Sequence, residues 1–140
     1  MAAHKNHLKL DFKRTQLILG IVLLVVFVLT GQYMEYVHNR QLPDGQRILY
    51  RSRHIYLLLN ALINISLGLY ARYAVSGWRR SLQIIGSVLI MLAPGFLLAG
   101  FFYEPPRGAD QTKIAPYGIF ATAIGMLFHL ISCWRKGREA

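Results

Sequence analysis

The sequence LILGIVLLVVFVL, residues 17–29, is apolar on every side and decides the fold class. It lies within the first of four stretches that contain no Asp, Glu, Lys or Arg. A helix rises about 1.5 Å per residue, so roughly 20 residues cross a hydrocarbon core about 30 Å thick. The four stretches hold 20, 17, 23 and 21 residues, at 15–34, 55–71, 81–103 and 114–134. Each is long enough, or nearly so, to cross a bilayer.

The apolar stretches sum to 81 of 140 residues, which is too much apolar chain for a soluble domain of this length to cover. Backbone groups in lipid must be paired within the segment, which favours helices, whereas a membrane β-barrel would show alternating strands of about ten residues. The sequence therefore predicts an all-α membrane protein, an up-down bundle of four transmembrane helices in a single domain over 1–140. Arg72 can keep its charged head at the interface, which extends the second span. The predicted spans are 15–37, 55–75, 81–103 and 114–134.

The basic residues are divided unevenly between the two ends of these spans. No Ala-x-Ala cleavage pattern follows the first apolar stretch, so we expect that helix to be retained, and four spans then put both termini on one side. That side has ten basic residues and the opposite side has six. Because cytoplasmic loops carry an excess of Lys and Arg, we expect both termini in the cytoplasm. Orientation and anionic lipid headgroups, rather than nucleic acid, explain the formal charge of +10.

The second predicted helix has a basic start and carries two amides. At 100° per residue Arg53, Asn60 and Asn64 share one face, which should point into the bundle because unpaired amides are costly in lipid. One interpretation is hydrogen bonding between helices, worth about 0.6 kcal/mol per bond and up to about 2. The other is a pocket for a small amphiphile, such as a quinone or a lipid, open to the outer side. The candidate ligand-binding residues are Gln32, Glu35, Arg51, Arg53, His54, Asn60 and Asn64.

Charged residues at the outer side allow the same two interpretations. Six basic residues face four acidic ones there, so salt bridges are expected. A residual positive patch would instead suit a carboxylate, a quinone or a lipid headgroup. The four acidic residues are Glu35, Asp44, Glu104 and Asp110.

The last two predicted helices carry an inner polar cluster and a proline. Gln83 and Ser87 lie at a similar depth to His129, near the inner end, and are its expected hydrogen-bond partners. Pro94, near the middle of the third span, removes the hydrogen bond to Ile90 and predicts a kink that serves either packing or a hinge. The fourth helix also has a small or polar stripe that favours close helix packing: Gly118, Thr122, Gly125, His129 and Ser132.

Motifs that carry chemistry are scarce. Membrane b-type cytochromes bind haem through paired histidines, whereas His38 and His54 fall at the outer face and His129 near the inner one. No Ser-His-Asp spacing, phosphate loop or CxxC occurs. No Asp, Glu, Lys or Arg lies deep within a span, which argues against a proton-coupled exporter. We therefore expect no cofactor and no metal site, and haem-dependent electron transfer is disfavoured.

Several strings resemble small bacterial four-span membrane proteins. They are SRHIYLLLN at 52–60, LGLY at 67–70, LAP at 92–94 and FFYEP at 101–105. The resemblance covers about the second and third helices, and it implies the four-span architecture and a bacterial inner membrane rather than an activity.

These observations favour an integral inner-membrane protein with a non-enzymatic, structural or accessory role. Its environment is the lipid bilayer, and its expected partners are a second copy of itself or a larger membrane complex, not nucleic acid. The amphiphile-binding and haem hypotheses stay as alternatives.

Overall fold

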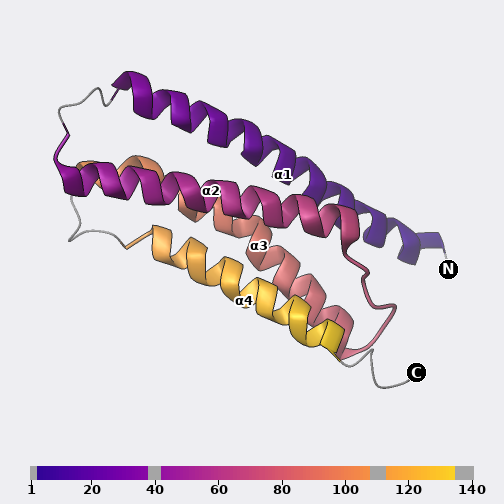
Figure 1. Ribbon diagram of the computed structural model, residues 1–140. Helices are drawn as coiled ribbons and strands as arrows, with labels where there is room; N and C mark the ends of the chain where they lie inside the picture. Colours follow the sequence, from indigo (N-terminus) through magenta and orange to yellow (C-terminus); the bar gives the residue numbers. More distant parts are fainter. Residues whose placement is uncertain (1–2, 38–41, 108–112, 135–140) are drawn as a thin grey trace.

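The structure, a computed structural model, describes residues 3–37, 42–107 and 113–134, with the backbone alone described over 3–11 and at 37. In these ranges four α-helices follow one another (Figure 1): α1 Ala3–Val37, α2 Asp44–Tyr70, α3 Trp78–Tyr103 and α4 Ala115–Cys133. A short 3₁₀ helix, η1, spans Pro105–Arg107. The described ranges contain no strand, which confirms the all-α prediction.

Three of the described helices are long and apolar enough to cross a membrane. These segments are Phe12–Tyr36, Trp78–Tyr103 and Ala115–Cys133. α2 is not among them and has the lowest mean hydropathy of the four helices, because its sequence includes Asn60, Asn64 and a basic start. Its 27 residues nevertheless extend about 40 Å, which exceeds the thickness of a hydrocarbon core.

The helices pack as two hairpins. Consecutive helices run in opposite directions, so α1 pairs with α2 and α3 pairs with α4 (Figure 1). The hairpins meet mainly through α2 and α3, whereas α1 and α4 make no contact within the described residues. We call the end that holds Asp44 and Tyr103 the outer end, and the end that holds Tyr70 and Trp78 the inner end.

Glycines allow the close approach of α1 and α2. A Cβ atom on Gly20 would lie 2.6 Å from Cγ1 of Ile65, and one on Gly68 would lie 2.7 Å from Cβ of Leu17. Both distances are too short for a side chain, so the two backbones approach each other where glycine stands in each helix. The first hairpin therefore depends on small residues, as membrane helix pairs commonly do.

The small stripe of α4 faces α3. A Cβ atom on Gly125 would lie 2.6 Å from the carbonyl oxygen of Gly86, so no larger residue fits there. All five members of the predicted stripe are buried: Gly118, Thr122, Gly125, His129 and Ser132. The stripe therefore serves contact within the chain.

Pro94 is buried inside α3, which remains helical on both sides of it. Gly95, the next residue, is exposed, and a Cβ atom there would meet nothing within 4 Å. The predicted kink at Pro94 stays a prediction.

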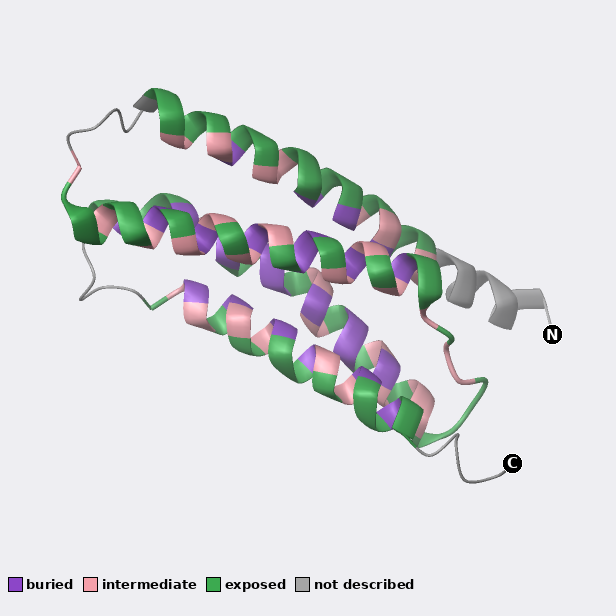
Figure 2. Cartoon of the chain, viewed as in Figure 1, coloured by how far each residue is buried: buried purple, intermediate pink, exposed green. Residues whose placement is uncertain are grey.

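The distribution of polar and apolar residues between the interior and the surface differs from that in a soluble protein. Each helix has exposed residues along one face and buried residues along another (Figure 2). Many of the exposed residues are large and apolar, and many of the buried ones are polar. Soluble proteins rarely expose contiguous apolar surface of this extent, and they rarely bury charged residues. The buried polar residues are Gln16, Thr30, Arg53, Asn60, Asn64, Gln83, Ser87, Glu104, Thr122, His129 and Ser132.

The bounds of α2 differ from those of the predicted second span. The helix begins at Asp44, inside the stretch expected to be a loop, because Asp44 lies in the first turn and its carboxylate pairs with Arg47. It ends at Tyr70 instead of continuing to about Val75, and Ala71 is extended at φ −62° and ψ 132°. Residues 71–77 form a non-helical connection across the inner end.

Candidate functional site

Polar side chains in the interior form three layers along the helices, and the outer layer is a buried ion pair. The Arg53 guanidinium on α2 donates from Nε to Oε2 of Glu104 at 2.8 Å, and their side chains are 9% and 1% exposed. Glu104 follows the last residue of α3, and its Oε1 accepts the backbone N–H of Ile114 at 2.6 Å and of Ala115 at 3.0 Å. The Glu104 carboxylate therefore neutralises the charge of Arg53 on α2 and caps the start of α4.

The surroundings of Glu104 favour its ionised form. Burial by itself would raise the pKa of this carboxyl group. The hydrogen bonds from Ala115, Arg53 and Ile114, together with the Arg53 charge, outweigh burial and hold the pKa below its usual range. The carboxylate also lies at a helix N-terminus, where a negative charge is stabilised. Glu104 is thus an ionised structural group at neutral pH.

The middle layer joins α2 to α4 through amides. Asn60 donates from Nδ2 to Oγ1 of Thr122 at 2.9 Å, and Asn64 donates from Nδ2 to Oδ1 of Asn60 at 2.8 Å. Thr122 in turn donates to the carbonyl oxygen of Gly118 at 2.8 Å. The prediction that Asn60 and Asn64 face the interior is confirmed. Asn60 bonds to another helix, whereas the hydrogen bonds of Asn64 stay within α2.

The inner layer is a chain of four side chains from four segments. Tyr73, in the 71–77 connection, donates its hydroxyl to Oε1 of Gln16 on α1 at 2.8 Å. The same hydroxyl lies 2.7 Å from Oγ of Ser87 on α3, which lies 3.0 Å from Nε2 of His129 on α4. The chain therefore joins the inner ends of α1, α3 and α4 to the connection that follows α2.

Gln83 has a different role from the one predicted. It does not bond to His129: its Oε1 accepts the backbone N–H of Ala74 at 2.7 Å, and its Nε2 donates to the carbonyl oxygen of Arg72 at 3.2 Å. The side chain takes the place of a strand partner for a non-helical segment, whose backbone groups need partners when buried. Of the two predicted partners of His129, Ser87 is confirmed and Gln83 is wrong.

Sequence reasoning missed two members of the inner chain. Neither Tyr73 nor Gln16 was among the predicted members of the inner polar cluster. The available signal was that Gln16 is polar within an otherwise apolar stretch, but its partner is 57 residues away in the sequence.

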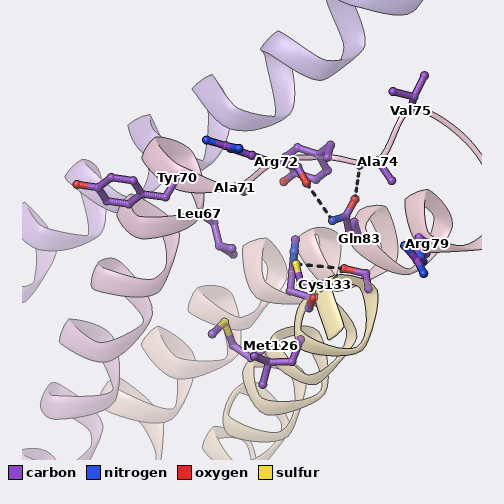
Figure 3. Close-up of a pocket in the computed structure, with 14 residues that line it drawn as sticks. Leu67, Tyr70, Ala71, Arg72, Ala74, Val75, Arg79, Gln83, Met126 and Cys133 are labelled. Carbon is purple, nitrogen blue, oxygen red and sulfur yellow. Dashed lines mark hydrogen bonds between the residues drawn. The ribbon is translucent and has the colours of Figure 1, made fainter. Parts of the chain in front are cut away.

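A cavity of about 680 Å³ opens beside this inner chain (Figure 3). Its wall comes from the end of α2, the 71–77 connection, the start of α3 and the end of α4. Both polar and apolar side chains contribute to it, among them Leu67, Arg72, Arg79, Gln83, Met126, His129, Leu130 and Cys133.

The predicted outer pocket is not assembled. Gln32, Glu35 and Arg51 are exposed, and Arg53 is engaged by Glu104. The His54 ring stacks on Phe27 at 4.0 Å between centroids, and its Nδ1 lies 3.0 Å from Oγ1 of Thr30. The candidate residues are therefore divided between separate contacts and do not surround one site.

The histidines lie apart from one another. His54 belongs to the outer half of α2 and His129 to the inner end of α4, and each has a hydrogen-bond partner there. Among the described side chains no three of His, Cys, Asp and Glu gather as a metal site would require. Other residues used in the sequence arguments lie outside the described side chains: Lys5, Lys9, His38, Arg40, Asp110, Arg135, Lys136 and Arg138.

No protein-family model, curated protein or solved structure matches this chain. The site is therefore interpreted from its own contacts.

Proposed function

We propose that the chain is a four-span integral protein of the bacterial inner membrane, with both termini in the cytoplasm and a non-enzymatic, structural or accessory role. The proposal includes an up-down arrangement of α1 to α4 in which α2 is the fourth span. It also includes kinship with the small bacterial four-span membrane proteins that the second and third helices resemble.

The observation that carries the proposal is that α2 buries its polar residues and exposes large apolar ones. Its polar residues Arg53, Asn60 and Asn64 are buried, so they lower its mean hydropathy without facing the surroundings. Its exposed face in the predicted membrane region carries Ser66, whose hydroxyl bonds to the carbonyl oxygen of Leu62, and large apolar side chains. Those of Ile55, Leu59, Leu62 and Leu69 are between 49% and 60% exposed. A face of this kind is suited to lipid, and the side-chain N–H groups of Asn60 and Asn64 donate to interior partners that lipid would not supply.

Side chains at the two ends support the orientation. The inner end presents Trp78 and Tyr70 to the surroundings, as expected of rings at the headgroup level. Lys13, Arg14, Arg72, Arg79 and Arg80 all belong to the same end. The full sequence puts ten basic residues at this end and six at the other, and such an excess favours the cytoplasmic side, so the inner end is assigned to the cytoplasm.

The pattern of hydrogen bonds supports a structural or accessory role. In the described interior, the outer and middle layers consist of polar groups that bond to one another and to helix termini. Such groups stabilise helix packing. The large exposed apolar faces of α1 and α4 are the surfaces available to lipid, to a second copy or to a larger membrane complex.

Cysteine accessibility tests the topology. In a Cys133→Ser background, Asp44→Cys should react in intact spheroplasts with a maleimide that cannot cross membranes. Ser76→Cys should react only after permeabilisation or in inverted vesicles. Reaction of both variants from the same side would contradict the crossing of α2, and reaction of Ser76→Cys alone in spheroplasts would reverse the orientation.

Purification in mild detergent followed by native mass spectrometry tests the role. A stable homo-oligomer or a larger membrane complex would support an accessory function. An absorbance spectrum with a Soret band would instead favour haem-dependent electron transfer.

A further inference from the structure

The α2–α4 groove is the feature that the proposed role does not use. α2 and α4 approach each other at few positions, and two cavities open along the line between them. The inner one is the cavity of about 680 Å³, and the second, about 190 Å³, lies beside Asn60 and Thr122 at the middle layer. Met126 lines both cavities, so they adjoin along α4. Together they form a groove that leads from the inner end toward the middle of the membrane.

The inner mouth of this groove is positively charged. Arg72 and Arg79 both line the inner cavity, and Figure 3 shows them on different sides of it. The described carboxylates, Glu35, Asp44 and Glu104, all lie at the outer end or in the connection that follows it. Arg79 lies 5.8 Å from the centroid of the Trp78 ring, and neither Arg72 nor Arg79 has a salt bridge to a described side chain. No described carboxylate therefore competes for an anion at this mouth.

Two other polar side chains of the wall bond within the protein. Gln83 holds the backbone of the connection, and His129 bonds to Ser87. The remainder of the groove is apolar: Leu67, Met126 and Leu130 line its inner part, while Leu59, Ile63 and Ile119 line its middle part. The groove thus has two cationic side chains at its inner mouth and apolar side chains farther along. A molecule with an anionic head and a hydrocarbon tail would match this arrangement. The inner cavity alone falls within the roughly 300–1,000 Å³ of small-molecule sites.

We propose that this groove binds an anionic phospholipid of the cytoplasmic leaflet. Arg72 and Arg79 hold the phosphate of its headgroup at the inner mouth, and one acyl chain follows the groove past Met126 between α2 and α4. The proposal rests on the membrane placement given above. It differs from the predicted amphiphile pocket, which was expected at the outer end.

Lipid competition in nanodiscs tests the headgroup contact. Full-length protein is placed in nanodiscs of phosphatidylcholine with increasing phosphatidylglycerol, and the lipid retained after transfer to detergent is counted by native mass spectrometry. The parent protein should retain phosphatidylglycerol in preference to phosphatidylcholine. The Arg72→Ala/Arg79→Ala variant should lose that preference by about tenfold or more, because each basic contact contributes substantially at an anionic surface. The matched control, Arg51→Ala/Arg107→Ala, removes the same charge from the outer end and should leave the preference unchanged.

A second pair of variants tests the acyl chain. Ala123→Phe places a ring in the middle part of the groove from an exposed position, and Met126→Trp fills the point where the two cavities adjoin. Either variant should weaken retention of a two-chain lipid while leaving the helical circular dichroism spectrum unchanged. If Met126→Trp fails to fold, Ala123→Phe alone tests whether the acyl chain occupies the groove. Added inorganic phosphate should not displace the lipid, because it offers no tail.

Three results would overturn the proposal. These are equal retention of both lipids by the parent protein, an equal loss in the outer-end control, and retention unaffected by both groove-filling variants. A dimer that dissociates on Ala123→Phe would show that a second copy, rather than a lipid, occupies the groove. The accessibility labelling is repeated on the same variants. Abnormal labelling contradicts the membrane placement, whereas normal labelling with lost selectivity contradicts only the lipid groove.

Discussion

At the outer end a buried guanidinium and a buried carboxylate neutralise each other, whereas at the inner end Arg72 and Arg79 face a cavity without a described carboxylate. The outer end is closed because Glu104 makes contacts to Arg53 and to the first backbone groups of α4. The inner end is held by neutral hydrogen bonds through Tyr73 and Gln83, and space remains beside them. Charge is thus neutralised in the interior at one end, whereas at the other it lines the cavity that we propose to bind lipid.

Of the changes considered, removal of the Glu104 charge should lower the free energy of unfolding most. Glu104→Gln leaves the Arg53 guanidinium buried without a counter-charge, and loss of one partner of a buried ion pair costs about 3 kcal/mol or more. The free energy of unfolding, measured by SDS titration in mild detergent, should fall by that order. Adding Arg53→Leu should recover part of the loss, because no unpaired charge then remains. A double variant less stable than Glu104→Gln would contradict the ion pair as the source.

Lowering the pH should also destabilise the outer end, by less than Glu104→Gln does. Because the pKa of Glu104 is lower in the folded protein than in the unfolded chain, its contribution is complete above the ordinary carboxyl pKa of about 4.3. That contribution is lost as the pH falls through the lowered folded value. Unfolding midpoints measured from pH 6 to pH 3 should therefore drop more for the parent protein than for Glu104→Gln. Identical pH profiles for the two proteins would contradict this assignment.

The inner end should respond more weakly. Tyr73→Phe removes the hydroxyl that bonds to Gln16 and Ser87, and it should cost about 1 kcal/mol, the usual scale for neutral hydrogen bonds in proteins and membranes. The same SDS titration measures it. A loss as large as that of Glu104→Gln would show that the inner chain carries as much stability as the ion pair.

The smallest effect should come from the exposed ion pair at the start of α2. Asp44 pairs with Arg47, but their side chains are 87% and 45% exposed, so water screens the attraction. Asp44→Asn should therefore change the free energy of unfolding by at most about 1 kcal/mol. This variant is the matched control for Glu104→Gln, since both exchange a carboxylate for an amide. A comparable loss in the two variants would remove the distinction between buried and exposed charge.

The helices could be predicted from the sequence because hydropathy is a local property. The uncharged stretches at 81–103 and 114–134 correspond closely to α3 and α4, and the spacing of Asn60 and Asn64 indicated which face of α2 is buried. The pairing of Arg53 with Glu104 could not be deduced in the same way. The two residues are 51 positions apart, and a charge count gives no information on which carboxylate meets which cation.

The connections were predicted less well for a related reason. The predicted second span begins only at 55, and Pro43, Asp44 and Gly45 are residue types that favour turns. The helix nevertheless begins at Asp44, because Pro and Asp also favour helix N-termini. At the other end of α2, the role of Gln83 as a backbone partner depends on how residues 71–77 return across the inner end. Such contacts are set by the tertiary arrangement and leave no local pattern.

The central claim is that α2 crosses the membrane as a fourth span. A measurement of whether α2 faces lipid tests this claim most directly. A nitroxide attached at Leu62→Cys in a Cys133→Ser background, in reconstituted bilayers, reports collisions with oxygen, which concentrates in lipid, and with a water-soluble nickel complex. We predict frequent oxygen collisions and few nickel collisions at Leu62, with the opposite pattern at Asp44→Cys. Nickel collisions at Leu62 as frequent as those at Asp44 would show that α2 lies in water, and would contradict the four-span account.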